Sequence, residues 1–300
     1  DAKHHHSPAY LGQVFRLYQE KYRRDDPIRF DGIILTDNHA LEFAARHREA
    51  LFPNTPIAAS GINDARSIPA NTDDINIIIE RVSHLETLSA ALRQNPATHT
   101  IHVAIDNTLT GQSIRQDFLN QTQSLAGRVR LDILPPMSKD DLLRFAEKRV
   151  PGELIYLLVY FQDATGQVFT AEEIPRVVAA RARVPVYVAW DFQLNTGVVG
   201  GCVTSAFGQG QKAAQTLLER LSGKNPPHLY DGLAGINRHT YDFNALQRFA
   251  EGVYLVWYPQ VSKVEAAELP RRQPHFGRQL LDTTGTTIGP WRSLHHQAPP

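Results

Sequence analysis

The stretch Phe30-Asp31-Gly32-Ile33-Ile34-Leu35-Thr36-Asp37-Asn38 decides the fold, because a short apolar run ends there in polar groups where a helix begins. That helix is predicted over about residues 39–50, and a second apolar run, residues 56–60, follows it. A strand, a helix and another strand joined by short loops are typical of βα units on a parallel sheet. The sequence therefore predicts an α/β fold.

The alternation of strand-like and helix-like runs continues on both sides of this stretch. Residues 8–24 are predicted to be helical, with Leu11, Val14 and Tyr18 on one face. The glycine-rich run 197–203 indicates close approach of the backbone to a neighbour. Further strands are predicted over 75–79, 100–105, 129–134, 154–160 and 186–189, and further helices over 83–94, 111–124, 138–149, 171–181 and 206–222.

The composition narrows the class of protein. Of 300 residues 42% are hydrophobic, and 31 Lys and Arg balance 31 Asp and Glu. These values are typical of a globular protein, and the length suits two lobes better than one. Because the chain has no Lys- or Arg-rich run, we expect no nucleic-acid partner. The single cysteine, Cys202, excludes an internal disulfide and a CxxC motif.

Targeting segments are not evident in the sequence. No stretch approaches 18 consecutive apolar residues, so no membrane-spanning helix is predicted. The sequence opens at Asp1 without a Met or the apolar core of a signal peptide, and we therefore expect a processed or excised piece.

Polar side chains follow five of the predicted strands. In open parallel sheets, ligands bind outside the carboxyl ends of the strands, where loops and helix N-termini supply hydrogen-bond donors. Two of the ends pair an aromatic residue with a carboxylate, which suits a pocket that sandwiches a small ligand. Each Asp, Asn or Ser also suits the ordinary role of a helix cap, and the aromatic residues suit core packing. The candidate ligand-binding residues are Asp37, Asn38, Ser60, Gly61, Asn63, Asn107, Phe161, Asp163, Trp190 and Asp191.

Several stretches resemble those of one bacterial family. They are residues 30–43, the run Arg48-Glu49-Ala50-Leu51-Phe52-Pro53-Asn54-Thr55-Pro56 followed by residues 60–63, residues 160–170, and Pro185-Val186-Tyr187 leading to Trp190-Asp191. The resemblance covers roughly residues 8–258. It is to ABC-transporter substrate-binding-like domains of the type I periplasmic-binding-protein fold, which serve as extracytoplasmic sensors of bacterial histidine kinases and diguanylate cyclases.

This resemblance implies two Rossmann-like lobes with parallel sheets that close on a small polar or amino-acid-like molecule. The first lobe is expected over 1–80 with a return over about 192–225, the second over 81–191 with 226–258, and a tail over 259–300. The loops that carry Phe161 and Trp190 would wall the cleft. The chain departs from the family pattern because it has no apolar strand before the first helix, which implies that the first lobe lacks a strand. Beyond about residue 265 it also shows no approach to a membrane segment.

The function implied by the resemblance is a periplasmic or extracytoplasmic ligand sensor in signal transduction, without catalytic residues in this chain. One alternative is a free solute-binding protein of an ABC importer. Another is an α/β enzyme that uses Asp163 or Asp191 as acid or base. The sequence also leaves a homodimer as one possible assembly.

We expect no cofactor and no metal. The run Gly208–Ala213 fits the pattern GxGxxA, but no second strand ending in an acidic residue follows it at the spacing of a dinucleotide site. The histidines near the two ends, at 4–6 and 295–296, lack the spacing of a metal site.

Overall fold

The computed structural model describes residues 7–23, 28–63, 65, 68–232 and 235–249, together with the backbone of two short strands, β11 (Leu280–Leu281) and β12 (Thr287–Ile288). The chain forms two compact units, Asp1–Ser262 and Lys263–Pro300. In the second unit β11 and β12 pair antiparallel. The rest of the expected tail, 259–300, lies outside the described residues.

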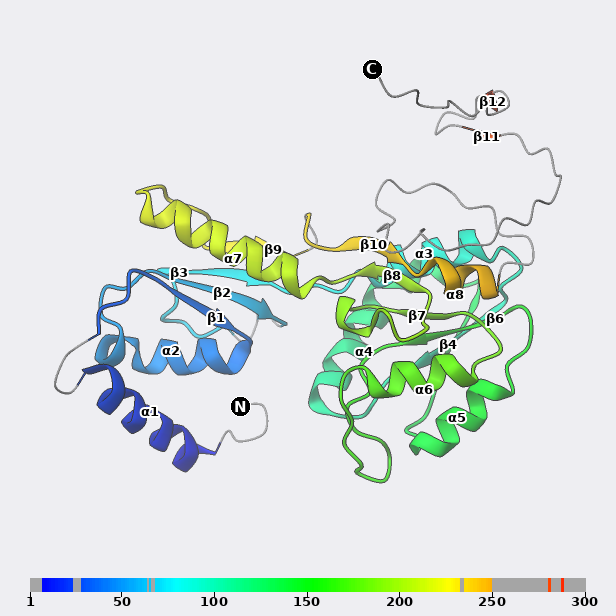
Figure 1. Cartoon of the computed structure of the whole chain (residues 1–300), viewed down its shortest axis with the longest axis horizontal. Helices are drawn as coiled ribbons and strands as arrows, with labels where there is room; N and C mark the ends of the chain where they lie inside the picture. Colours follow the sequence, from blue (N-terminus) through cyan, green and yellow to red (C-terminus); the bar gives the residue numbers. More distant parts are fainter. Residues whose placement is uncertain are drawn as a thin grey trace, which may run out of the picture. The chain divides into compact units, whose positions relative to one another are not determined.

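The first lobe is built on a four-stranded parallel sheet in the order β1-β2-β3-β9 (Figure 1). Its strands are β1 (Ile33–Thr36), β2 (Ile57–Ile62), β3 (Ile75–Ile79) and β9 (Leu229–Asp231). All five residues of β3 are buried, as expected for an isoleucine-rich strand covered on both faces, and the one polar residue among them, Asn76, donates hydrogen bonds to the Pro226 and Pro227 carbonyls.

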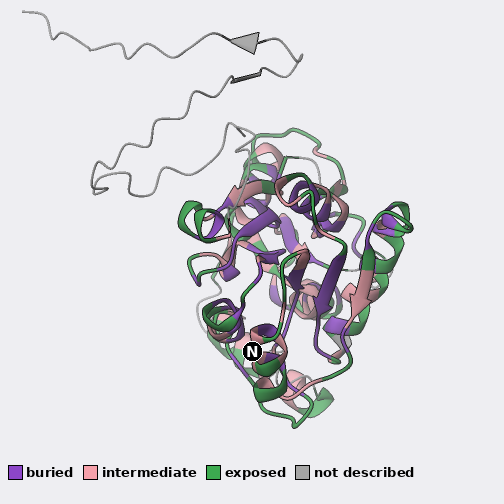
Figure 2. Ribbon diagram, turned by 90° about the vertical axis from the view of Figure 1, so that its right-hand side faces the viewer, coloured by how far each residue is buried: buried purple, intermediate pink, exposed green. Residues whose placement is uncertain are grey.

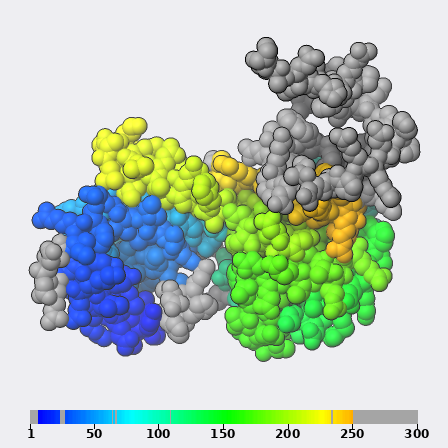
Figure 3. All heavy atoms as spheres, in the orientation of Figure 1, coloured from blue at the N-terminus to red at the C-terminus, as the bar shows by residue number. Residues whose placement is uncertain are grey.

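Helices cover both faces of this sheet. Helix α2 (Asn38–Leu51) packs on one face and α7 (Ala206–Leu221) on the other, while α1 (Pro8–Arg23) packs against α2 (Figure 1). Leu41 of α2 and Leu217 of α7 belong to the two apolar clusters that hold these layers together. The outer face of α7, the yellow helix in Figure 3, is open to solvent, and Leu218 there is 66% exposed.

The second lobe is built on a six-stranded sheet in the order β10-β8-β7-β6-β4-β5, in which the described pairs are parallel except β10 with β8. Helices α3 and α4 share one apolar cluster with this sheet, and α5 and α6 share the cluster on its other face. Figure 2 shows buried residues along the strands and exposed residues on the outward sides of the helices. The remaining elements are α3 (His84–Gln94), β4 (Thr100–Ala104), α4 (Leu109–Gln121), a 3-10 turn η2 (Gln123–Leu125), β5 (Arg130–Ile133), α5 (Lys139–Glu147), β6 (Glu153–Leu157), α6 (Glu173–Arg181), β7 (Val186–Val188), a second 3-10 turn η3 (Asp191–Gln193), β8 (Gly200–Val203), β10 (Arg238–Tyr241) and α8 (Phe243–Arg248).

The chain passes between the two sheets three times, after β3, after β8 and after β9. The three crossing segments are hydrogen-bonded to one another. Thr204 Oγ1 donates to the Arg81 carbonyl at 3.2 Å, and Asn237 Nδ2 donates to the same carbonyl at 2.7 Å and to Ser83 Oγ at 2.8 Å. Gly232 lies so close to β3 that a Cβ there would be 1.8 Å from the Ile79 carbonyl oxygen. The lobes are thus joined by a narrow, closely packed set of connections.

The predicted alternation of helices and strands is confirmed along the described chain, and the α/β class with it. The expected lobe boundaries differ from the sheets at two places. Strand β8, expected in the first lobe, pairs in the six-stranded sheet, whereas β9, expected in the second lobe, pairs in the four-stranded sheet. The physical reason for β8 is its glycines: a Cβ at Gly200 would be 2.1 Å from the Thr240 carbonyl oxygen, and one at Gly201 would be 2.4 Å from that of Val188. Only glycine allows the neighbouring strands to approach so closely.

Candidate functional site

The carboxyl ends of β1 and β2 bring five of the candidate residues together. The Asp37 N–H donates to the Ser60 carbonyl at 2.9 Å, and the Asn63 N–H donates to Asn38 Oδ1 at 3.0 Å. Gly61, between Ser60 and Asn63 in the chain, has φ of 69°. These contacts arise because neighbouring parallel strands end at the same edge of a sheet. The predicted residues therefore form one polar cluster at the N-terminus of α2.

Asp37 contributes to this cluster through both its side chain and its backbone. Its side chain caps α2 by accepting a hydrogen bond from the N–H of Asn38, the first residue of the helix, at 2.7 Å. Its backbone has φ of 78° and ψ of 156°, a region occupied almost only by glycine. Such strain costs on the order of 1–3 kcal/mol and concentrates at functional positions.

Gln209 joins this cluster from α7 and was not among the candidate residues. Its side chain is 3% exposed, and Oε1 accepts a hydrogen bond from the Gly61 N–H at 3.3 Å. Nε2 has no hydrogen-bond partner among the described residues. A signal in the sequence was available, because Gln209 shares the buried face of α7 with Ala213 and Thr216 at helical spacing. A polar side chain on the apolar face of a predicted helix is an unusual pattern, and it indicates a specific hydrogen-bonding role.

Trp190 connects the carboxyl ends of the two sheets. It follows β7 of the second lobe, and its indole Nε1 donates a hydrogen bond to Glu80 Oε1, just after β3 of the first lobe, at 3.0 Å. The ring is 5% exposed and stacks on Phe192 with 6.0 Å between ring centroids. Glu80 was not among the candidate residues, because a single glutamate after a strand carries no distinguishing pattern in sequence.

Asp191 lies at the crossing that leads into α7. Its N–H donates to the Thr204 carbonyl at 3.1 Å, and Oδ2 accepts a hydrogen bond from the Ala206 N–H at 2.9 Å. The carboxylate therefore satisfies a free N–H at the N-terminus of α7, the helix that carries Gln209.

Phe161 is positioned by a buried carboxylate. The Phe161 N–H donates to Asp106 Oδ2 at 2.7 Å, while Oδ1 accepts from the N–H and hydroxyl of Thr108 at 3.1 and 2.6 Å. Phe161 packs against the apolar cluster of the second lobe to which Trp190 belongs. The structure thus brings both aromatic residues to one cluster, and a cleft between their loops stays a prediction. Asn107 is exposed, and its carbonyl accepts from Gln112 Nε2 at 3.0 Å.

Asp163 orders its own loop. Oδ1 accepts hydrogen bonds from the N–H and hydroxyl of Thr165 and from the N–H of Gln167, and Oδ2 accepts from the N–H of Lys139. Burial opposes ionisation of this carboxyl, but these hydrogen bonds outweigh it and lower its pKa to about 2. Such a group stays ionised at neutral pH and cannot act there as a general acid. Its contacts and those of Asn107 lie within the second lobe, away from the polar cluster around Gly61.

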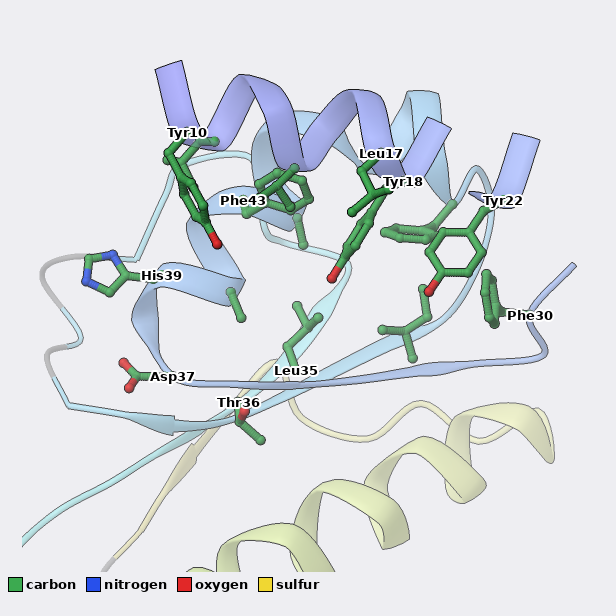
Figure 4. Close-up of a pocket in the computed structure, with 16 residues that line it drawn as sticks. Tyr10, Leu17, Tyr18, Tyr22, Phe30, Leu35, Thr36, Asp37, His39 and Phe43 are labelled. Carbon is green, nitrogen blue, oxygen red and sulfur yellow. The ribbon is translucent and has the colours of Figure 1, made fainter. Parts of the chain in front are cut away.

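A cavity of about 690 Å³ lies elsewhere in the first lobe, between α1, α2 and β1 (Figure 4). Tyr10, Tyr18 and Tyr22 point into it from α1, and Phe43 faces it from α2. Within the described ranges no group of three or more His, Cys, Asp or Glu side chains could hold a metal ion. The helices in that same part of the chain include none long and apolar enough to cross a membrane.

Comparison with known proteins bears on the fold. No family model matches the chain, and no curated protein is significantly similar to it in sequence. Among solved structures it is similar to a conserved domain protein from Vibrio cholerae, with 14% identity over 83% of this chain and 81% of that one and a TM-score of 0.55. It is also similar to the ligand-free, open structure of a substrate-binding protein with adhesive properties from Clostridium difficile, with 13% identity, 81% and 78% coverage and a TM-score of 0.56.

A third similar structure is an ABC domain from Streptococcus pneumonia in complex with L-Trp, with 11% identity, 80% and 79% coverage and a TM-score of 0.52. At these identities the likeness concerns the arrangement of the elements. Together with the two sheets and the three crossings, it shows that the chain has an α/β fold of the type I periplasmic-binding-protein kind.

Proposed function

We propose that this chain binds a small polar or amino-acid-like molecule at the carboxyl ends of its two sheets, and that a change in the angle between the lobes is the output. The observation that carries the proposal is the hydrogen bond from Trp190 to Glu80, which joins the carboxyl end of one sheet to that of the other. In open α/β sheets this is the edge where ligands bind.

The polar cluster supplies the groups for the ligand's anionic part. Helices α2 and α7 both begin there, and the N-terminus of a helix carries a partial positive charge and N–H groups without partners in the helix. The carboxylates of Asp37 and Asp191 accept from only one of these N–H groups in each helix, those of Asn38 and Ala206. Gln209 adds a buried donor that lacks a partner among the described residues. Trp190 and Phe161 offer aromatic surface for the apolar part of the ligand.

The three crossings supply the hinge. Lobe closure in such a protein concentrates its backbone changes in a few residues between rigid bodies. Here those residues are the short segments around Arg81, Thr204 and Asn237, which are hydrogen-bonded to one another. A ligand shifts the balance between open and closed forms only as far as it binds one of them more tightly.

The sequence resemblance favours a sensor on the extracytoplasmic face of a bacterial membrane, which passes the lobe movement to a kinase or cyclase module. The Clostridium difficile structure, named a substrate-binding protein, supports ligand binding and suits an ABC importer component equally. Acid–base chemistry by Asp163 is disfavoured because its oxygens accept hydrogen bonds from its own loop and from α5.

Thermal-shift screening with amino acids and small polar metabolites, followed by calorimetry on each stabilising compound, tests ligand binding. We expect at least one compound to raise the melting temperature of the wild type. Trp190→Phe and Gln209→Met should weaken its binding by about tenfold or more, the value of one good polar contact. Gln211→Met, on the exposed side of the same helix, is the matched control and should bind normally. Normal binding by Trp190→Phe and Gln209→Met would place the ligand elsewhere.

Assays on the full-length gene product distinguish a sensor from a transport component. A compound that passes the first test should change kinase or cyclase activity in a sensor. If it instead stimulates ATP hydrolysis by a reconstituted importer, the transport alternative holds. Turnover of the compound by the chain itself would support an enzyme.

A further inference from the structure

Helix α7 exposes large apolar side chains on the side that faces away from its sheet (Figure 3). Its buried side, which includes Ala213 and Leu217, packs on strands of the first lobe. On the opposite side Phe207 and Leu218, 76% and 66% exposed, are the two most exposed large apolar side chains in the described chain, and Leu221 is 46% exposed. Single exposed apolar residues are ordinary on a protein surface, but three on one side of one helix form a patch of the kind that binds another protein.

The exposed residues of α7 have the spacing of a helix–helix contact. Phe207, Gln211, Ala214, Leu218 and Leu221 follow one another at intervals of four, three, four and three residues. These are the intervals between the a and d positions of a heptad, and they place side chains along one side of a helix so that a second helix can pack on them. These five residues form what we call the α7 seam. Gln211 is the only polar residue among them.

An open groove lies along the α7 seam. Its volume is about 440 Å³, and its lining includes Gln211, Ala214 and Leu218 of the seam and Glu219 on one flank. Every lining residue belongs to α7 or to the three residues that follow it, so the groove has no opposite wall among the described residues. A second helix in the groove would supply that wall and remove the apolar side chains of the seam from water.

We propose that a second copy of this chain covers the α7 seam, and that the two α7 helices pair antiparallel about a two-fold axis at the level of Thr216. A two-fold axis brings the same patch of both copies together, so the patch must be complementary to itself. In an antiparallel pair whose a and d positions lie level, each Leu218 faces the partner's Ala214. A large side chain then meets a small one on both sides of the axis, which allows the helices to pack closely.

The charges beside the seam favour the antiparallel orientation. Lys212 and Glu219 lie seven residues apart on the same flank of α7, and contacts with Tyr230 and Gln215 keep both side chains on this flank. In the antiparallel pair, Lys212 of each copy lies level with the partner's Glu219, so opposite charges meet twice. In a parallel pair each lysine would lie beside the other lysine and each glutamate beside the other glutamate, and like charges repel.

Other features of α7 limit both the occupant and the strength of the contact. A helix that lies on a membrane surface has a polar face rich in Lys and Arg, whereas the flank of this seam carries one charge of each sign, Lys212 and Glu219. The 16 residues of α7 span about 24 Å, so two such helices bury less than the roughly 800 Å² per partner of a standard interface. We therefore expect a reversible dimer that forms as the concentration rises.

Sedimentation velocity of the 300-residue chain from about 1 µM to about 1 mM tests the pairing, because an interface of this size is weak. Leu218→Glu places a charge in the seam and should raise the dissociation constant of the dimer by at least about tenfold. Leu119→Glu, at another exposed leucine, on α4 of the second lobe, is the matched control and should leave the constant unchanged. A monomer at every concentration would overturn the proposal and leave a different protein as the occupant. Equal effects of the two substitutions would also overturn it.

Disulfide crosslinking tests the orientation of the two helices. Gln215→Cys lies next to the proposed axis, Ser222→Cys lies one heptad further along the same flank, and the unmodified chain with its buried Cys202 is the blank. In the antiparallel pair the two copies of position 215 are about 3 Å apart along the helix axis, and those of position 222 about 18 Å. We therefore expect Gln215→Cys to crosslink at least about tenfold faster under mild oxidation.

Equal crosslinking rates for Gln215→Cys and Ser222→Cys would indicate a parallel pair and overturn the antiparallel proposal. A dimer that neither cysteine crosslinks would place the interface away from α7 and overturn it as well. Neither experiment requires a ligand, so both outcomes are independent of the proposed binding site.

Discussion

Trp190 and Glu80 are 110 residues apart in the chain, and a hydrogen bond of 3.0 Å joins the indole Nε1 of the first to Oε1 of the second. Glu80 directly follows the carboxyl end of β3, Trp190 lies two residues after the carboxyl end of β7, and the two strands belong to different sheets. The contact therefore couples the lobes at the edge where the proposed ligand binds.

The strength of this coupling can be measured. Trp190→Phe keeps an aromatic ring in the apolar cluster but removes the donor, and Glu80→Ala removes the acceptor. A double-mutant cycle from urea denaturation should give a coupling energy of about 1.5–3 kcal/mol, the value of a hydrogen bond to a charged group. The cycle separates the bond from the packing lost with the smaller ring. A coupling energy near zero would mean that the bond does not form in solution.

Asp106→Asn should destabilise the second lobe by about 2–3 kcal/mol, because both oxygens of this buried carboxylate accept hydrogen bonds and the amide can accept through only one. The free energy of unfolding in urea is the measurement. Asn107→Asp makes the reverse exchange at the next, exposed position and should change stability by less than about 0.5 kcal/mol. Equal effects of the two substitutions would contradict the role assigned to Asp106.

His84 should make stability depend on pH. Burial lowers its pKa to about 3, and Nδ1 lies 2.9 Å from the Tyr156 hydroxyl oxygen. In the unfolded chain the pKa is about 6.5, so protonation favours unfolding. The stability that neutral His84 contributes to the folded protein is fully present above pH 6.5, and it is lost as the pH falls from 6.5 toward 3.

Replacing His84 with Gln should flatten the pH dependence in that window. The measurement is the difference in free energy of unfolding between pH 7 and pH 4.5, which should be smaller in His84→Gln than in the wild type. His228→Gln, at a half-buried position before β9, should retain the wild-type difference. If both variants behave alike, His84 does not control this transition.

Gly232 is the tightest point among the lobe crossings. A methyl group there would meet the Ile79 carbonyl oxygen at 1.8 Å, so Gly232→Ala must shift the backbone that joins β9 to β3. We expect a loss of more than about 2 kcal/mol in the free energy of unfolding. In contrast, Gly210→Ala in α7 meets nothing within 4 Å and should stabilise the protein by about 0.5–1 kcal/mol. Differential scanning calorimetry of the two variants would show the opposite shifts, and a neutral Gly232→Ala would refute the close contact.

Much of the fold follows from local pattern. The run Ile75–Ile79 is a strand with the predicted bounds, because four of its five residues are isoleucine and β-branched residues suit a strand buried on both faces. The polar groups after β1 and β2 lie together because parallel neighbours end at one edge. Local spacing was therefore enough to predict the alternation of elements and to place Asp37, Ser60 and Gly61 at the ends of strands, while their role in binding stays a prediction.

Sequence alone determined the order and kind of the elements, since hydrophobic period and capping residues act within one or two turns of the chain. The tertiary structure alone decided that β8 lies in the six-stranded sheet and β9 in the four-stranded sheet, that Glu80 and Gln209 reach the candidate site, and that a cavity lies between α1, α2 and β1. These features depend on which distant surfaces pack together. Contacts such as that of Gly61 with Gln209, 148 residues away, are selected by the burial of whole helix and sheet faces and have no local signature.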